Sequence, residues 1–224
     1  MEPTFSPAWF TTFGRPDDGV TTREVEFLEK VLPPPPATVL DVPCGYGRHA
    51  RALAARGYRV TGVEREPAVA AAARAGGVEI HELDLRRLDE LPGRFEAVIC
   101  MWASFGWYDD DTNAAVFAAM AGKAARTLVL DVYDPSFFRD HQGISDNRGV
   151  RDEKRVEGDR LWTLLDYPDG TRDEFEWRLY EPEELQELGS RLGLRLDAVC
   201  GAFDSEKPPS SETPRTQLVF RRDT

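Results

Sequence analysis

Two acidic residues flank a glycine turn in the first third of the chain. Asp41 ends one apolar run, Gly45 and Gly47 follow it, and Glu64 ends the next apolar run. Glycine lets the backbone approach a ligand closely, and a helix that begins after the turn offers free N–H groups. A carboxylate at Glu64 can accept hydrogen bonds from both hydroxyls of a ribose. The spacing therefore predicts a site for a nucleoside ligand.

Two kinds of nucleoside ligand fit this outline, and the position of Asp41 separates them. Residues 45–50 read G-Y-G-R-H-A, which satisfies the dinucleotide pattern G-x-G-x-x-G/A. In dinucleotide sites the first glycine directly follows the strand, whereas here Asp41 lies four residues before Gly45. A carboxylate at that position repels a pyrophosphate but suits a ligand with an ammonium group, such as S-adenosylmethionine.

The segment Asp41–Gly47 resembles the first motif of the class I S-adenosylmethionine-dependent methyltransferases, which reads roughly acid-x-G-x-G-x-G. Pro43 stands where that motif has its first glycine. The resemblance extends over roughly residues 20–222. It implies an α/β, doubly wound, mostly parallel seven-stranded sheet with an antiparallel last strand. It also implies an antiparallel β insert over the active site, after strand five.

The resemblance assigns cofactor contacts to the ends of the predicted strands. Asp84 corresponds to the family's acid after strand three, which faces the adenine amino group, with Leu85 against the ring. Met101 and Trp102 end strand four, where the family supplies a backbone carbonyl and an apolar wall. The predicted cofactor-binding residues are Asp41, Gly45, Tyr46, Gly47, Glu64, Asp84, Leu85, Met101 and Trp102.

Acceptor contacts are predicted from aromatic content and from analogy with the family, whose aromatic segment after strand four resembles residues 104–108. The predicted substrate-binding residues are Phe13, Trp107, Tyr108, Arg148, Trp177 and Arg178. Tyr133 and His141 are the predicted catalytic residues. A histidine such as His141 can serve as general base if the acceptor is a hydroxyl that must lose its proton, and a neutral amine needs no base.

Metal chemistry is not expected. The run Asp109–Asp111 resembles a metal site but is more typical of a helix N-terminus, where acids favour the helix dipole. Cys44, Cys100 and Cys200 lack metal-ligand spacing and cannot form a closed set of disulfides. We expect them to be small buried apolar residues.

Short apolar strands alternate with helices between residues 38 and 133. This alternation is typical of a parallel sheet covered on both faces, in which ligands bind beyond the carboxyl ends of the strands. The predicted strands are Thr38–Val42, Tyr58–Glu64, Val78–Leu83, Phe95–Trp102 and Thr127–Tyr133.

The alternation stops after residue 133. Three strand-like runs, Val150–Val156, Leu161–Asp166 and Thr171–Tyr180, are joined by turn sequences and predict antiparallel pairing. A helix over Glu183–Leu192 and two further strands complete the chain. We predict one methyltransferase-like domain over 1–224, with an aromatic strap or lid at 1–19 and a cofactor-binding core at 38–133. A β insert follows at 145–180, and a closing helix and hairpin at 182–222.

Composition limits the partners. The net charge is −12 over 224 residues, which disfavours nucleic acid because phosphate binding depends on clustered Lys and Arg. No apolar run approaches the ~20 residues that span a bilayer, and the N-terminus lacks a signal-peptide pattern. We therefore expect a soluble, cytoplasmic protein that acts on a small molecule; the oligomeric state is open.

The sequence favours methyl transfer from S-adenosylmethionine to a small-molecule acceptor by in-line displacement. Alignment and exclusion of water can supply on the order of 7–11 kcal/mol for such a step, so no nucleophile is required. Two alternatives share the nucleoside site: an NAD(P)-dependent oxidoreductase, and a non-catalytic protein that binds S-adenosylmethionine.

Overall fold

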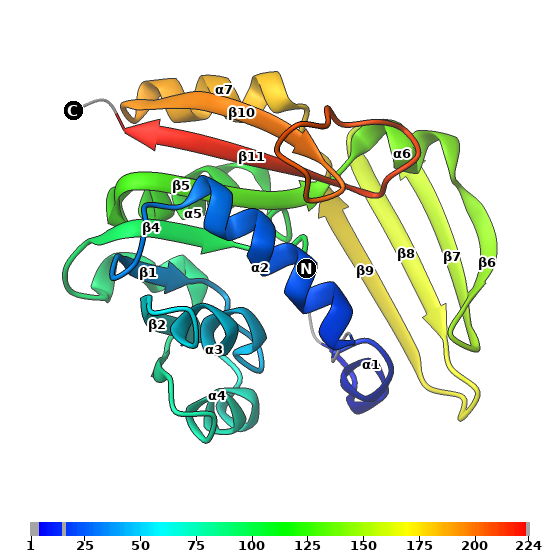
Figure 1. The fold of residues 1–224 in the computed structure, drawn as a ribbon. Helices are drawn as coiled ribbons and strands as arrows, with labels where there is room; N and C mark the ends of the chain where they lie inside the picture. Colours follow the sequence, from blue (N-terminus) through cyan, green and yellow to red (C-terminus); the bar gives the residue numbers. More distant parts are fainter. Residues whose placement is uncertain (1–4, 15–16, 223–224) are drawn as a thin grey trace.

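A seven-stranded sheet forms the centre of the protein, with strand order β10-β11-β5-β4-β1-β2-β3 (Figure 1). The computed structural model describes residues 5–14 and 17–222. Strands β1 to β5 run parallel to one another, and β11 runs antiparallel to both β5 and β10. This arrangement confirms the predicted fold class. The strands are β1 Thr38–Asp41, β2 Arg59–Glu64, β3 Glu79–Glu82, β4 Phe95–Cys100, β5 Ala124–Tyr133, β10 Leu194–Gly201 and β11 Arg215–Arg222.

Helices cover both faces of this sheet because its inner strands are apolar on both sides. On one face, α2 and α3 pack over Val39, Ile99 and Val129; on the other, α5 and α7 pack over Leu40 and Leu128. Alternate residues of one strand thus serve two separate cores. The helices around the sheet are α2 Asp18–Val31, α3 Arg48–Ala54, α4 Pro67–Arg74, the 3-10 helix η1 Leu85–Glu90, α5 Asp110–Lys123 and α7 Pro182–Arg191.

The β insert is a separate four-stranded antiparallel sheet with order β6-β7-β8-β9. It stands beyond the ends at which β1, β4 and β5 point (Figure 1), and α6 (Pro135–Asp140) leads into it. Its strands are β6 Gly143–Asn147, β7 Val150–Glu157, β8 Arg160–Asp166 and β9 Arg172–Arg178. The three predicted runs correspond to β7, β8 and β9. The sequence did not indicate β6 because all its residues are exposed, which leaves no alternation to detect.

The N-terminal segment forms a short helix, α1 (Pro7–Thr12), that is fastened to the insert. Ser6 caps α1 and also donates two hydrogen bonds to Asp173 of β9, from its hydroxyl (2.7 Å) and its backbone N–H (3.2 Å). Phe5 packs on Trp107 and Phe175 with ring centroids 5.3 and 5.1 Å apart. Residues 1–4 and 15–16 of the predicted strap lie outside the described residues.

Candidate functional site

The glycine turn joins β1 to α3 and is tied to the end of β2. Gly45 and Gly47 have φ angles of 54° and 74°, a left-handed conformation that favours glycine. The backbone N–H of Gly45 donates to Glu64 Oε2 at 3.0 Å, and that of Cys44 donates to the carbonyl of Val63 at 2.8 Å. Consequently the two predicted acids and the turn between them lie together at the carboxyl ends of β1 and β2.

Asp41 is a fully buried carboxyl group, and neither of its oxygens makes a well-formed hydrogen bond with residues 5–14 or 17–222. Burial raises the pKa of Asp41 to about 7, partly offset by the charge of Arg48 and by the backbone N–H of Ala50. Asp41 does not line the cavity described below. Arg48 and Glu64, whose charges shift the pKa of Asp41, do line it.

Glu64 and Asp84 differ in the hydrogen bonds that their carboxylates accept within the protein. Glu64 accepts from the N–H groups of Gly45 and Glu66 (2.9 Å), and burial raises its pKa. Asp84 begins η1 and accepts three hydrogen bonds from Arg86 at 2.8–2.9 Å, a pairing that lowers its pKa. Glu64 and Leu85 line the cavity, whereas Asp84 does not.

One large cavity of about 1290 Å³ lies between the glycine turn, the strand ends, α1 and the insert. It brings together twelve of the predicted site residues: Phe13, Gly45, Tyr46, Glu64, Leu85, Met101, Trp102, Trp107, Tyr108, Tyr133, Arg148 and Trp177. Its wall changes from the glycine turn at one end to aromatic rings at the other. Trp107 and Trp177 pack with ring centroids 4.1 Å apart, and Tyr133 meets the Trp177 ring at 5.1 Å.

Tyr133 is partly buried in this aromatic wall, and removal from water raises its pKa to about 12. Its phenol therefore keeps its proton at neutral pH. Such a group can donate a hydrogen bond to an acceptor but is a poor general base.

Trp102 is held in a left-handed backbone conformation by a buried acid that the sequence analysis missed. Trp102 and Ala103 have φ angles of 66° and 52°. Asp131, at the carboxyl half of β5, accepts from the N–H of Trp102 at 2.8 Å and from the side chains of Arg215 (2.7 Å) and Gln217 (2.8 Å). These bonds fix the loop that carries the indole into the cavity.

A second buried acid, Glu24, joins α2 to two other parts of the fold, α3 and β11. It accepts from Arg48, lies 2.9 Å from Nε2 of His49, and accepts from Arg215 at 2.8 Å. Burial alone would raise the pKa of Glu24, but the His49 contact and the two guanidinium groups lower it to about 2. Burial lowers the pKa of His49 to about 4, so the imidazole is neutral at physiological pH. Arg48 and Arg215 form the charged floor of the cavity beside Trp102, with their guanidinium carbons 5.1 and 5.9 Å from its ring centroid.

His141 does not reach the cavity. It follows α6 on the surface, where its ring stacks on Phe137 at 4.1 Å and its Nδ1 lies 2.9 Å from the Phe137 carbonyl oxygen. The prediction rested on the pKa of free histidine and on a loop position after strand five. Neither of these fixes the direction of a side chain, and the position of His141 outside the cavity does not support a catalytic role.

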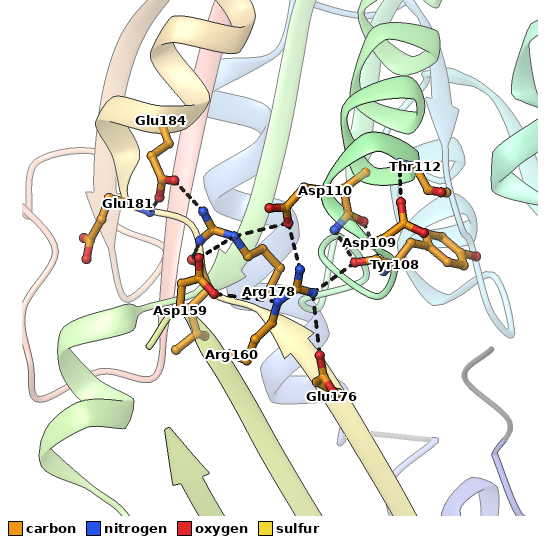
Figure 2. A network of polar contacts seen from close by, with 12 residues as sticks. Tyr108, Asp109, Asp110, Thr112, Asp159, Arg160, Glu176, Arg178, Glu181 and Glu184 are labelled. Atoms are coloured by element: carbon orange, nitrogen blue, oxygen red, sulfur yellow. Dashed lines mark hydrogen bonds and ion pairs between the residues drawn. The ribbon is translucent and has the colours of Figure 1, made fainter. Parts of the chain in front are cut away.

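Arg178 also points away from the cavity, into a network of acids at the junction of three elements (Figure 2). Its guanidinium pairs with Glu184 of α7 at 2.5 Å, with Asp159 at 3.2 Å and with Asp110 at 3.4 Å. In the same network Asp109 caps α5 by accepting from Thr112 at 2.8 Å, as predicted for this aspartate run. Arg178 therefore fastens the insert to the main sheet's helices.

Four polar residues of the insert line the cavity and were not predicted: Asn147, Asp152, Lys154 and Thr163. A sequence signal for two of them exists. Asp152 and Lys154 share the face of β7 that carries Val150 and Val156, because alternate residues of a strand point to one side. Charged residues in phase with apolar ones indicate an inward-facing polar site.

Comparisons with known proteins agree with this geometry. Residues 39–124 match the family model described as a methyltransferase domain. Around this domain, the position of antiparallel β11 between β5 and β10 distinguishes the sheet from the all-parallel dinucleotide-binding sheet. The resemblance to class I S-adenosylmethionine-dependent methyltransferases, predicted from the glycine turn, is thereby confirmed.

Similar solved structures extend over nearly the whole chain. An S-adenosylmethionine-dependent methyltransferase from Clostridium acetobutylicum matches with a TM-score of 0.77 at 17% identity, over 97% of each chain. An amino pentose methyltransferase from Micromonospora echinaspora, involved in calicheamicin biosynthesis and solved with S-adenosylmethionine bound, matches with a TM-score of 0.70 at 22% identity, over 98% of each chain. At these identities the likeness establishes the fold.

A curated relative matches over a shorter stretch. The ubiquinone biosynthesis O-methyltransferase of Xylella fastidiosa is 32% identical over 106 residues, which cover 43% of this chain and 43% of that protein. The chain thus aligns with less than half the length of this relative. Within the described residues, no helix is long and apolar enough to cross a membrane.

Proposed function

We propose that this protein is an S-adenosylmethionine-dependent methyltransferase that acts on a small-molecule acceptor. The observation that carries the proposal is the fully buried Asp41 carboxylate, which lies behind a left-handed glycine turn, makes no well-formed hydrogen bond in the described part of the chain, and has the Ala50 N–H as its nearby backbone donor. A buried carboxylate is costly unless something compensates its charge. A ligand with an ammonium group supplies that compensation, whereas a pyrophosphate would add to the repulsion.

The residues present fit such a cofactor. The Gly45 turn would hold its amino-acid end, with the buried Asp41 carboxylate behind the turn opposing the ammonium charge, while Glu64 would hold its ribose and Leu85 and Met101 its adenine. When bound, the cofactor supplies a methyl group on a positively charged sulfur. Asp84 contributes less than the family pattern implies, because Arg86 already occupies its carboxylate.

The chain's own contribution to the reaction is alignment and exclusion of water. Trp107, Trp177 and the α1 aromatics line the cavity, and Phe10 of α1 also reaches Tyr46 of the glycine turn, with ring centroids 6.0 Å apart. Loss of positive charge at sulfur is not opposed by a dry, apolar surrounding, so a wall of this kind suits the reaction. Tyr133, protonated at neutral pH, would orient an acceptor by donating a hydrogen bond rather than by removing a proton.

A small acceptor is supported by the shape of the site and by the relatives. The aromatic end of the cavity is enclosed by α1 and the insert, and the protein's net charge of −12 disfavours a polyanion. The amino pentose and ubiquinone-pathway methyltransferases to which the chain is similar are named for small-molecule pathways.

Calorimetric titration with S-adenosylmethionine, S-adenosylhomocysteine and NADH tests the proposal. We expect micromolar binding of both sulfur nucleosides and none of NADH. Glu64→Ala should weaken binding at least tenfold, while Glu183→Gln on the exposed first turn of α7 serves as control and should leave it unchanged. Preference for NADH would refute the proposal. Tight cofactor binding without methyl transfer to any amine or hydroxyl acceptor tested would instead indicate a non-catalytic binder.

A further inference from the structure

A polar cluster interrupts the inner face of the β insert. In the register of the insert, Asp152 of β7 lies opposite Leu165, and Lys154 lies opposite Thr163 of β8. Asp152 and Thr163 are therefore diagonal neighbours on one face of the sheet, and all four residues line the cavity. Phe175, which lies opposite Thr163 on β9, continues the same face as an apolar wall.

Two atoms of this cluster are buried and have no partner. Asp152 is 2% exposed and Thr163 is 4% exposed. Oδ2 of Asp152 accepts from Lys154 Nζ and from Asn147 Nδ2 (3.1 Å), but Oδ1 of Asp152 and Oγ1 of Thr163 have no hydrogen-bond partner in the described chain. Leaving one such group unpaired costs about 1–3 kcal/mol, so its retention requires an explanation.

A neighbouring acid shows that the insert satisfies its buried carboxylates where they are structural. Asp173 lies opposite Leu165 on β9 and is also buried. It accepts from Ser6 and from the Tyr167 hydroxyl (2.9 Å), and these bonds fasten α1 to the insert. By contrast, Asp152 Oδ1 and Thr163 Oγ1 accept or donate no hydrogen bond within the described residues, and both side chains line the cavity.

We propose that Asp152 and Thr163 form the recognition site for the methyl acceptor, and that the acceptor carries two polar groups on adjacent carbons, at least one of which donates a hydrogen bond. Amino alcohols and vicinal diols have this chemistry. The inference rests on the proposed function, because it places the acceptor in the cavity that the cofactor shares.

The spacing of the cluster suits such a pair of groups. Diagonal cross-strand neighbours lie about 7–8 Å apart, and somewhat less at Cβ. The two unpaired oxygens belong to side chains that line one cavity from these neighbouring positions, so adjacent heteroatoms of one molecule can hydrogen-bond to both. Asp152 Oδ1 can only accept when ionised, Thr163 Oγ1 can donate or accept, and the Lys154 ammonium adds donors beside them. The surrounding aromatic wall then covers the carbon skeleton, as in other sites with few polar groups.

The cluster does not suit a metal ion or a simple anion. It contains a single carboxylate, which is already bound to the Lys154 ammonium, and the described residues include no group of three potential metal ligands. The Asp152 carboxylate would repel an anion.

Two matched pairs of probes test the inference. With S-adenosylhomocysteine bound, we would measure by ligand-observed NMR the affinity of trans-2-aminocyclohexanol against cyclohexylamine, and of catechol against phenol. Each pair differs by one adjacent hydroxyl. We expect at least one two-group probe to bind about tenfold more tightly than its partner, which corresponds to one hydrogen bond of ordinary to charge-assisted strength. The pair that discriminates identifies a saturated amino alcohol or an aromatic diol as the source.

Variants attribute the discrimination to the cluster. Thr163→Val keeps the shape and removes the unpaired hydroxyl, so it should not lower the Tm, yet it should reduce the discrimination at least fivefold. Asp152→Asn should do the same, while Glu174→Gln on the exposed face of β9 should leave it unchanged. Every one of these variants should bind S-adenosylhomocysteine as the wild type does.

Either of two results would overturn the inference. The first is that neither pair of probes shows a difference in affinity, whether both members bind equally or neither binds. The second is that Thr163→Val retains the full discrimination. If Asp152→Asn does not fold, Thr163→Val decides alone. Failure of S-adenosylhomocysteine to bind the wild type would overturn the proposed function instead, so the two failures are distinguishable.

Discussion

Asp41→Asn should stabilise the free protein while weakening its cofactor site. Burial raises the pKa of Asp41 from 3.8 to about 7, a rise of about three units. At ~1.4 kcal/mol per unit this places ~4 kcal/mol of unfavourable free energy on the ionised carboxylate in the folded protein. Asparagine has nearly the same shape and no charge. Because its amide is also buried and must find partners, we expect a net gain of about 2–4 kcal/mol at pH 8.

The gain must depend on pH in a defined direction. The pKa of Asp41 is higher in the folded state than in the unfolded state, so the destabilising effect is complete above pH 7. It decreases as the pH falls from 7 towards 4, where the folded protein takes up the proton, and it disappears below the unfolded value of 3.8. Urea unfolding of wild type and Asp41→Asn between pH 5 and pH 8 measures this, with the difference largest at the highest pH.

A second buried aspartate provides the matched control. Asp131 is equally buried, and burial raises its pKa too, but it accepts from Arg215, Gln217 and Trp102, so Asp131→Asn loses a charged pair and should destabilise the protein. Asp41→Asn should also bind S-adenosylhomocysteine at least tenfold more weakly, or ~1.4 kcal/mol. Equal stability of Asp41→Asn and wild type at pH 8, a gain that does not vary with pH, or wild-type cofactor affinity would each refute the reasoning.

Three further substitutions probe the rest of the site. Arg215→Met removes the cation between Glu24 and Asp131 and should cost about 3–5 kcal/mol in urea unfolding, because two buried carboxylates lose a partner; a loss under 1 kcal/mol would contradict this role. Ser6→Ala removes the cap of α1 and the hydroxyl bond to Asp173 of β9, so it should speed proteolytic cleavage before residue 17 without changing the Tm by more than a few degrees; cleavage at the wild-type rate would show that the remaining backbone, Arg148 and aromatic contacts suffice to hold α1. His141→Ala should leave turnover and cofactor affinity unchanged, and a loss of turnover with normal cofactor binding would restore His141 as a catalytic candidate.

Local patterns in the sequence were sufficient for the cofactor half of the site. Asp41 and Glu64 each follow an apolar strand, and parallel strands bring their carboxyl ends to one edge, so their proximity follows from the fold class. Arg215 could not be found this way. It stands at the start of the last strand, and its contact with Glu24 joins residues 191 positions apart, for which a single sequence offers no signal.

The acceptor half was predicted less well for a related reason. Its residues come from α1, the loops after β4 and β5, and the insert, and their directions depend on how these pieces pack. Aromatic composition was enough to indicate Trp107 and Trp177, because large apolar rings are buried wherever they can be. It was not enough for Asp152, whose inward direction is visible only once the alternation along β7 is read in phase with Val150.

The hydrogen bonds between Ser6 and Asp173 join α1 to the β insert, the two segments that line the aromatic end of the cavity. We therefore expect these two segments to change together in evolution. The insert interrupts the main sheet in sequence, because it lies between β5 and β10. It cannot be replaced on its own, because β9 carries the carboxylate that holds the N-terminal helix. A chimera that exchanges residues 143–178 alone would separate Asp173 from its donor. Exchange of acceptor specificity between relatives of this chain should therefore require both segments to be transferred together.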